Sequence, residues 1–514
     1  MSLHQERLTK TPAISGWINR LLRIHWYHLV VLMICFTLTA FVAYKSAVAS
    51  FTHDESLSFT RYVPLPVMDI LTYTPPFTNN HILNTILMKY SARIFGVSEF
   101  SLRLPNVLGM LIYLYFSYRT VSIGKAGRRY ASSLLFIPMV ANPYLIDFFG
   151  CARGYGLSVS FMMLSLFYLI RYVERGSQRD IILFNAGSLL AILSNFALVN
   201  YYLSALIALN VLIYTDNKFR IQGESLLKYF LKSNKTNLVF ILLDTIIFYV
   251  PFRKIMQGNM INFGGKEGFI QDTVLSLVRK SSYDEWPSRF MEIFLMISII
   301  AISTGLFFYF LINLRKVKYL IKAFNHLFIV NTILILVAIS TILQHFIFGT
   351  DYLMERFGLF LIPLFLLTFV MWLKHWIVHT RSMAPIYSAL VLVVFSCHNL
   401  FSNLNVRYYI DWKYDVDTKR VVQALSAHYL ANLNGEENVK CGVNWLFEPA
   451  VNFYRDLYDL QWLAPADREG WNPDDDFHYI FQWDADMASV EDRIIFRGLE
   501  SVLLARSSPL QISK

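Results

Sequence analysis

Apolar residues dominate the first 400 or so positions of the chain, where they recur in runs separated by short polar or basic stretches. A helix of about 17 to 22 apolar residues is long enough to cross the hydrocarbon core of a membrane, which is roughly 30 Å thick. We count about eleven such runs and predict a membrane-spanning helix for each. The predicted spans are 28–46, 104–123, 130–146, 155–172, 181–196, 199–214, 237–252, 293–314, 327–348, 357–373 and 385–401.

Basic residues cluster in alternate loops between these runs, which predicts the orientation of the chain. With a cytoplasmic N-terminus, every basic loop falls on the cytoplasmic face, as the positive-inside rule requires. The loops contain Lys125, Arg128 and Arg129; Arg171 and Arg175; Lys218 and Arg220; Arg315, Lys316, Lys318 and Lys322; and Lys374 and Arg381. An odd number of spans then places the C-terminus outside. The first span lacks a small-residue cleavage site, which favours an uncleaved signal anchor.

Composition supports a membrane protein. The chain is 55% hydrophobic and only 16% charged, whereas soluble proteins carry about 25% charged residues. A net charge of +10 could indicate a nucleic-acid partner, but its placement in short loops indicates membrane orientation, so we expect no nucleic acid. The four cysteines are scattered without CxxC spacing, which favours neither a disulfide framework nor a zinc site.

Two long segments are predicted on the outer face. The first, residues 49–103, is polar, aromatic and broken by prolines, which is typical of short helices at the membrane interface. The second begins near Ser402 and carries about half of the acidic residues. A helical pattern over Val421–Leu433 and strand patterns over Val439–Trp445 and Tyr479–Trp483 predict a small α/β domain there. The predicted fold is an α-helical polytopic membrane domain (1–402) with a C-terminal extracytoplasmic α/β domain (403–514).

The first candidate for chemistry is Thr52-His53-Asp54-Glu55, directly after the first span. Thr52 and Glu55 have the spacing of a capping box, which explains Glu55 better than Asp54. A helix starting here places Asp54 and Arg61 on one face, so a base and a phosphate-binding cation could project together. The alternative is that Asp54 only complements the helix terminus.

Two further candidates lie at the outer ends of later helices. Asp147 and Arg153, near Tyr155, could line one cavity or form a plain interfacial ion pair. Glu355 and Arg356 fall in a very short outer loop that could equally be an ordinary polar turn. None of the histidines His53, His81 and His345 has a partner at metal-ligand spacing. The default interpretation of each is therefore a structural histidine. The sequence implies no cofactor and does not exclude a divalent metal.

The polar segment Arg253–Arg289 should lie outside, and Gly264-Gly265 indicates a mobile stretch within it. It could close over a bound donor as a lid, or be a passive loop.

The order of these motifs resembles a known family. An acidic pair after the first helix is followed by a His-centred outer loop, then by Phe95-Gly96-Val97-Ser98-Glu99 and Leu102-Arg103-Leu104-Pro105. This arrangement is similar to the GT-C superfamily of polyprenyl-phosphate-sugar-dependent glycosyltransferases, in the branch of protein O-mannosyltransferases and lipid A aminoarabinose transferases. The likeness covers about the first 200 residues well and the remainder mainly by topology. Many members carry a Pro-Pro element in the first loop, where this chain has Asn79-Asn80-His81-Ile82-Leu83-Asn84.

The resemblance implies a GT-C-like fold in which Asp54 is the principal catalytic carboxylate, with Glu55 beside it and Asp147 as the second outer acid. A sugar on a lipid phosphate has a good leaving group, so transfer needs a base for the acceptor hydroxyl and cations for the phosphate. We predict inverting transfer with Asp54 as base. The candidate phosphate ligands are Arg61, Arg103, Arg153 and Arg356, and the candidate substrate contacts are His53, Asn80, His81, Tyr155 and Glu355.

The expected partners are a polyprenyl-phosphate-linked sugar, membrane lipid, and a glycolipid, glycan or protein acceptor. The expected location is a bacterial inner membrane, with the N-terminus cytoplasmic and the C-terminus outside. A transporter or flippase is the main alternative, although the chain shows no internal repeat and only 22 glycines. A membrane scaffold and a polymerase or ligase of lipid-linked oligosaccharides are further alternatives.

Overall fold

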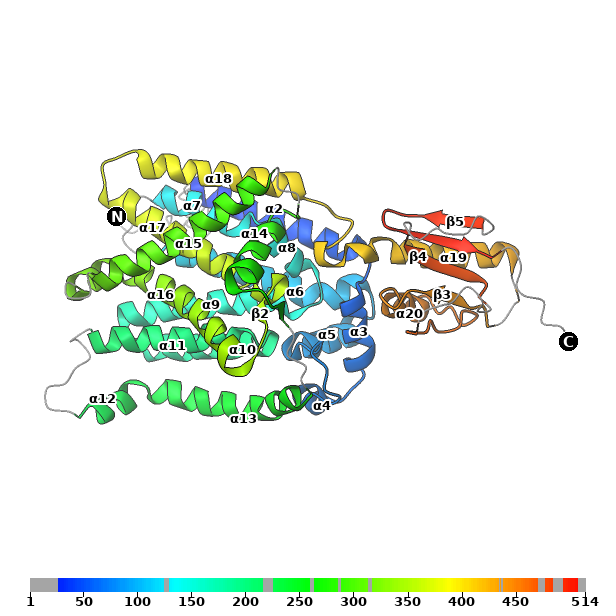
Figure 1. Ribbon diagram of the computed structural model, residues 1–514, viewed down its shortest axis with the longest axis horizontal. Coiled ribbons are helices and arrows are strands. Elements are labelled where there is room, and N and C mark those ends of the chain that lie inside the picture. The colour runs from blue at the N-terminus through cyan, green and yellow to red at the C-terminus, as the bar shows by residue number, and fades with distance from the viewer. Residues whose placement is uncertain are drawn as a thin grey trace, which may run out of the picture.

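The computed structural model describes residues 26–123, 129–215, 225–258, 263–284, 288–312, 317–433, 435, 438–469, 477–483 and 493–506. They form a long helical bundle with a small mixed domain at one end (Figure 1). The bundle contains α2 (Trp26–Val48), α6 (Glu99–Val121), α7 (Arg129–Val140), α8 (Pro143–Gly150), α9 (Gly154–Arg175), α10 (Gln178–Ser194), α11 (Leu198–Thr215), α12 (Leu226–Ser233), α13 (Lys235–Gln257), α15 (Arg289–Ile312), α16 (Val317–Phe348), α17 (Leu361–His379) and α18 (Ala384–Asn403). Shorter elements close its end: α3 (His53–Tyr62), α4 (Val67–Leu71), α5 (Ile82–Phe95), β1 (Gly264–Gly265), η2 (Phe269–Leu275), α14 (Ser276–Lys280), β2 (Tyr352–Leu353) and η4 (Glu355–Gly358).

Among the described residues each predicted span overlaps helix, but the helices are unequal. Among the described residues, six are long and apolar enough to cross a membrane: α2, α9, α17, α18, and the stretches Arg289–Phe310 of α15 and His326–Phe348 of α16. A seventh is added if α7 and α8, which meet at 71°, count as one broken span. The helices therefore support an integral membrane protein without fixing eleven spans.

The predicted continuous span 130–146 is wrong, because the chain bends between α7 and α8. Pro143 has no N–H to donate to the preceding turn, and it disfavours helical geometry at Asn142. Asn142 instead begins α8 as its cap, where its side-chain oxygen accepts from the Leu145 amide at 2.9 Å. The bend turns Asp147 on α8 towards the inside of the bundle, where its side chain is 4% exposed.

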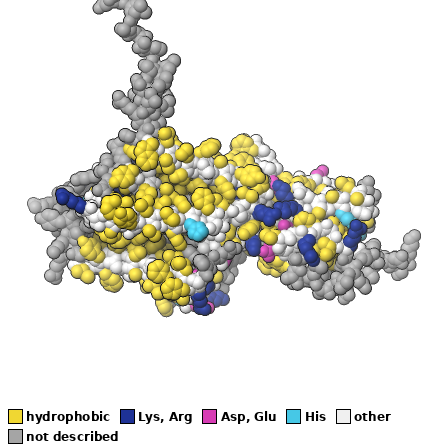
Figure 2. Space-filling view, turned by 90° about the horizontal axis from the view of Figure 1, so that it is seen from above, with side chains coloured by type: hydrophobic (Ala, Val, Ile, Leu, Met, Phe, Trp, Pro, Cys, Tyr) yellow, Lys and Arg dark blue, Asp and Glu magenta, His cyan; other side chains and the backbone are white. Residues whose placement is uncertain are grey.

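The outer surface of the bundle is apolar. Large side chains such as Phe36, Phe290, Ile312 and Phe346 are each more than 70% exposed. Figure 2 shows hydrophobic side chains over most of the bundle and basic side chains gathered near its junction with the smaller domain. Exposed apolar area of this extent is unfavourable in water and favourable in lipid.

The C-terminal domain begins with η5 (Ile410–Asp417) and α19 (Thr418–Asn432). Its four-stranded sheet has the order β3-β4-β6-β5, with β3 parallel to β4 and the other pairs antiparallel. The remaining elements are β3 (Cys441–Val443), α20 (Glu448–Leu457), β4 (Tyr479–Trp483), β5 (Arg493–Arg497) and β6 (Ser501–Ala505). The sequence predicted the helix at α19, a longer version of β3, and β4 with its bounds, but neither α20 nor the β5–β6 pair.

This domain shares a core with the outer end of the bundle. Phe51 stacks on Phe453 with ring centroids 4.2 Å apart, and its amide donates to the Tyr454 hydroxyl at 2.7 Å. Figure 1 shows α3 and α5 at the bundle end that faces the domain. The long outer loop and the C-terminal domain therefore lie on the same side, as the predicted topology requires.

We expect labelling of single cysteines in intact cells to divide along this axis. Cysteine at Lys266 or Gln461, both exposed at the domain end, should react with a membrane-impermeant reagent. Cysteine at Gln178 or Ser382, exposed at the opposite end, should react only after permeabilisation, because the positive-inside rule predicts that the basic loops are cytoplasmic. Reaction at Ser382 in intact cells would reverse the assigned orientation.

Candidate active site

The start of α3 sets the positions of the two adjacent carboxylates. The Thr52 hydroxyl accepts from the Glu55 amide at 3.4 Å, and the Thr52 amide donates to Glu55 Oε2 at 2.9 Å, which confirms the predicted capping box. Asp54 lies in the first turn with its side chain 15% exposed. The cap therefore engages Glu55 and leaves the Asp54 carboxylate for other contacts.

Glu55 forms a fully buried ion pair with Arg103. Arg103 Nε and Nη2 donate to the carboxylate at 2.8 and 2.7 Å, and both side chains are 0% exposed. Burial would raise the pKa of Glu55, but Arg103 and the amide of Ala152 outweigh it and lower that pKa, so Glu55 stays ionised.

The remaining donors of Arg103 are also occupied. Nη1 donates to the carbonyls of Ser46 and Ala49, and Nη2 to the carbonyl of Ser50, at 2.7 to 3.0 Å. Together with Glu55 these acceptors use all five N–H groups of the guanidinium. This geometry favours a structural role for Arg103 and Glu55 and leaves Arg103 no donor for a phosphate.

Asp54 lies between two arginines from distant parts of the chain. Its Oδ2 is 3.8 Å from Arg153 Nη2 and 3.5 Å from Arg356 Nη2. Burial would raise the pKa of Asp54, but Arg153 and Arg356 outweigh it and lower that pKa, with a hydrogen bond from the Trp412 side chain in support. The carboxylate is therefore ionised at neutral pH.

Arg153 is held in place by the first outer loop. Its Nη1 donates to the Ser58 hydroxyl at 3.0 Å and to the Asn79 carbonyl at 3.1 Å. The Asn79 side chain in turn donates to the Asp54 carbonyl at 2.9 Å. The Nε of Arg153 is buried without a hydrogen-bond partner among the described residues. The Arg153 guanidinium therefore has a donor available for an anion.

Arg356 reaches the site from η4. Its guanidinium lies 5.0 Å from the Trp412 ring centroid and 5.6 Å from that of Phe357. Burial would lower its pKa, but Asp54, Tyr155 and Asp411 raise it, so Arg356 stays charged. Direct N⁺–H···O⁻ bonds are about 2.7–2.9 Å long. The longer separations from Asp54 mean that neither arginine is fully engaged by it.

A second charged cluster adjoins Arg356, and of its members the sequence singled out only Glu355. Lys280 Nζ lies 3.5 Å from Asp411, 3.6 Å from Glu355 and 3.0 Å from Asp284. The Tyr144 hydroxyl donates to Asp411 Oδ2 at 2.9 Å. Burial raises the pKa of Asp411 to about 6, against the opposing effect of Arg356 and Lys280.

Asp147 is placed away from Asp54 and pairs within the bundle. Its Oδ1 lies 2.6 Å from Lys45 Nζ, and its Oδ2 accepts from the Ile410 amide at 3.1 Å. Both charged side chains are nearly inaccessible. This contact fixes the residue before Asp411, so the geometry favours a positioning role for Asp147.

The remaining predicted residues divide between the site and its surroundings. Arg61 is exposed with its guanidinium 5.2 Å from the Phe77 ring centroid, and among the described residues Asp54 pairs with Arg153 and Arg356 and not with Arg61. His53 bonds through Nδ1 to the Leu446 carbonyl at 2.7 Å, in the C-terminal domain. Asn80 donates to the Ile70 carbonyl at 2.9 Å inside the outer loop.

His81 and Tyr155 line the buried side of Arg153. Their ring centroids are 4.8 Å apart, and His81 Nδ1 lies 2.8 Å from the Ser194 carbonyl. Burial, with Arg153 in support, lowers the pKa of His81 to about 3, so the ring is neutral and donates through Nδ1. Gly154 makes this packing possible, because a Cβ there would lie 1.9 Å from the Ser194 carbonyl oxygen.

The predicted mobile stretch Gly264-Gly265 forms β1, paired antiparallel with β2 just before Arg356. Gly264 has φ +85°, and a Cβ on Gly265 would lie 2.8 Å from the Tyr352 carbonyl oxygen. The segment thus supports the loop that carries Arg356. Within the described part of the chain, no group of three His, Cys, Asp or Glu side chains could hold a metal ion.

No protein-family model matches the chain, and no curated protein matches it. Two solved structures of ArnT from Cupriavidus metallidurans, one bound to undecaprenyl phosphate and one in the apo state, align with 96% of this chain and 98% of their own. Their TM-scores are 0.45 and 0.47, each at 12% identity. Similarity at this level does not assign an activity to the chain.

Proposed function

We propose that this protein is a membrane glycosyltransferase that moves a sugar from a polyprenyl-phosphate carrier to an acceptor hydroxyl. The observation that carries the proposal is an ionised, partly exposed Asp54 between two incompletely engaged arginines, at the outer end of an apolar bundle. The bundle offers lipid-facing surface for a carrier tail, and the arginines offer donors for its phosphate. A glycolipid, a glycan or a protein could supply the hydroxyl.

The proposed reaction is a single displacement at the anomeric carbon. The acceptor oxygen bonds to that carbon, the bond to the phosphate oxygen breaks, and the acceptor proton passes to Asp54. The carrier leaves as a phosphate monoester with one more negative charge than the donor had, and Arg153 and Arg356 stabilise that charge. Such a leaving group needs no general acid, so one carboxylate suffices and the anomeric configuration inverts.

Donor binding would also make Asp54 a better base. In the free protein the two arginines lower its pKa. A phosphate placed between them would draw their donors away and add negative charge near Asp54, and both effects raise the pKa of the carboxylate. The base would therefore gain proton affinity once the donor is bound.

The supporting residues take different parts in this proposal. Asp411 and Lys280 set the charge beside Arg356, while His81 and Tyr155 pack behind Arg153. Asp147 holds Ile410, and Glu55 with Arg103 anchors the start of α3. A bacterial inner membrane, with the site on the outer face, is the location that the basic loops and the resemblance favour.

Asp54→Asn should reduce single-turnover transfer by about 10²- to 10⁴-fold, because the amide cannot accept the hydroxyl proton. The thermal midpoint should stay close to that of the wild type, since the side chain keeps its size. Asp69→Asn is the matched control and should transfer normally, because Asp69 lies in the same outer loop and its side chain forms no hydrogen bond or ion pair among the described residues. Near-normal turnover in Asp54→Asn would reject Asp54 as base and favour the transporter alternative.

Glu55→Gln should instead lower stability, by about 3–5 kcal/mol, because Arg103 would remain buried without its counter-charge. This expectation replaces the milder effect that a capping box alone would predict. Thermal unfolding in detergent measures it, and adding Arg103→Gln to Glu55→Gln should recover part of the loss. Full stability with lost turnover in Glu55→Gln would contradict the structural assignment.

Donor affinity should weaken as pH rises through about 6, because Asp411 ionises near that pH and then competes with the donor phosphate for Arg356 and Lys280. Below that pH Asp411 is neutral, and the site carries more net positive charge. A prenyl phosphodiester is the suitable ligand, since its own charge is constant between pH 5 and about 8. Asp411→Asn should bind it several-fold more tightly at pH 7.5 and without the pH dependence. An unchanged pH dependence in that variant would exclude Asp411 as its source.

A further inference from the structure

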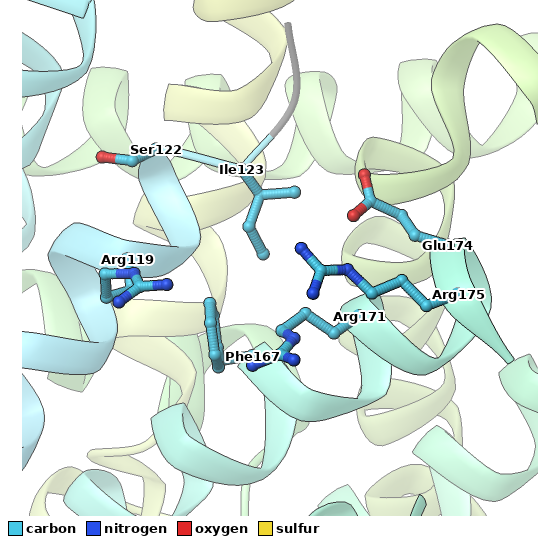
Figure 3. A pocket seen from close by; sticks show the side chains of 7 residues that line it. All are labelled: Arg119, Ser122, Ile123, Phe167, Arg171, Glu174 and Arg175. Carbon is cyan, nitrogen blue, oxygen red and sulfur yellow. The ribbon is translucent and has the colours of Figure 1, made fainter. Parts of the chain in front are cut away.

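A second basic site lies at the opposite end of the bundle. A half-open cavity of about 230 Å³ lies there between the last turns of α6 and α9 and the residues that follow α6. Figure 3 shows the side chains that line it: Arg119, Ser122, Ile123, Phe167, Arg171, Glu174 and Arg175. Three of these seven side chains are arginines.

The cavity is separate from the Asp54 site. Arg153 lies at the start of α9 and Arg175 at its end. At 1.5 Å per residue, the 22 residues of this helix place the two ends roughly 33 Å apart. That distance is close to a bilayer core, so the cavity faces the opposite leaflet. The basic loops predict that this leaflet is the cytoplasmic one.

The cavity lining carries more positive charge than the neighbouring carboxylates neutralise. Arg171 pairs with Asp180 at 3.3 Å, and Glu174 is engaged by His326 at 2.8 Å. Among the described residues, no carboxylate lies within 4 Å of the guanidinium of Arg119 or Arg175. Figure 3 shows these two guanidinium groups pointing towards each other across the cavity.

The neighbouring groups strengthen this field and orient it. The guanidinium groups of Arg119 and Arg171 lie 5.4 and 5.5 Å, respectively, from the centroid of the Phe167 ring. Lys374 Nζ donates to the carbonyl of Ile123 at 2.9 Å, which adds a further cation beside the lining. Converging guanidinium groups fixed by an aromatic ring form a typical phosphate-binding arrangement.

The surface next to the cavity indicates where that phosphate comes from. Leu108, Leu111 and Tyr115 are 52%, 46% and 52% exposed, and with Arg119 they follow one face of α6 at three- and four-residue spacing. Arg119 donates to the Tyr115 hydroxyl at 2.8 Å. An exposed apolar stripe thus leads along the membrane to the arginines. A soluble phosphate would leave this apolar stripe uncovered, whereas the acyl chain of a lipid would cover it.

We propose that this cavity binds the phosphate of an anionic phospholipid in the leaflet opposite Asp54, with an acyl chain along the α6 stripe. Arg119 and Arg175 bind the phosphate, and Arg171 supports them through Phe167. Basic pockets between helices are suited to such headgroups. The inference is independent of the transferase activity, because no residue is shared between the two sites.

The test uses the full chain in nanodiscs of phosphatidylcholine doped with phosphatidylglycerol, with retained lipid measured by native mass spectrometry. Arg119→Gln/Arg175→Gln removes the two unneutralised charges. Arg179→Gln/Arg381→Gln is the matched control, because it removes two exposed charges from the same end of the bundle outside the cavity. Arg175→Gln alone is the second variant if the double substitution fails to fold.

Phosphatidylglycerol affinity should fall by about 25-fold in Arg119→Gln/Arg175→Gln, from about fivefold for each arginine. Phosphatidylglycerol affinity should fall much less in the control. Phosphatidylcholine retention should be equal in the wild type and the two double variants. Equal losses in both double variants would show only diffuse attraction and overturn the site. Displacement of the lipid by millimolar inorganic phosphate would identify a free-phosphate site and overturn the lipid assignment.

Discussion

The outer end of this protein depends on one buried ion pair, between Glu55 on α3 and Arg103 on α6. Arg103 ties together the last residues of α2, through their carbonyls, and the start of α3, through Glu55. Glu55 also accepts from the amide of Ala152, two residues before α9. The pair therefore fixes the backbone on both sides of Asp54 and directly before Arg153. Breaking it would leave an uncompensated charge in a dry environment, which makes the arrangement rigid.

That rigidity explains how two adjacent carboxylates can differ so much in role. Successive residues of a helix are rotated by about 100° from one another, so Asp54 and Glu55 face different surroundings. Glu55 turns inward to a matched counter-charge with complete hydrogen bonding. Asp54 turns to two arginines at longer distance, with part of its side chain open. A carboxylate that stays ionised while its contacts with the neighbouring cations remain incomplete is suited to accept a proton in a reaction.

The sequence predicted what depends on local pattern. Hydrophobic runs located the helices of the bundle, the Thr52–Glu55 spacing identified the cap, and a strand-like run identified β4 with its bounds. The sequence also placed Asp54, Arg153 and Arg356 among the candidates, and the structure brings them together. Their functional roles remain predictions.

What the sequence did not predict depends on contacts between distant segments. Asp411 follows the last span, and nothing local indicates that η5 returns over the bundle to meet Lys280. Lys45 sits inside an apolar run, so its pairing with Asp147 became visible only in three dimensions. Arg103 looked like a phosphate ligand by charge and position. Only the count of its acceptors shows that the guanidinium is already fully used.

The stacking of Phe51 on Phe453 joins the C-terminal domain and the end of the bundle into one folding unit. The sequence suggests a division near residue 402, yet Phe51, Met88 and Leu102 belong to the same hydrophobic cluster as the C-terminal strands. Phe51 directly precedes the cap of α3. A chain cut at that division would expose this aromatic surface to water and loosen the turn that presents Asp54. The C-terminal domain and the end of the bundle that carries Asp54 thus share one interior, and the two parts are expected to fold as one body.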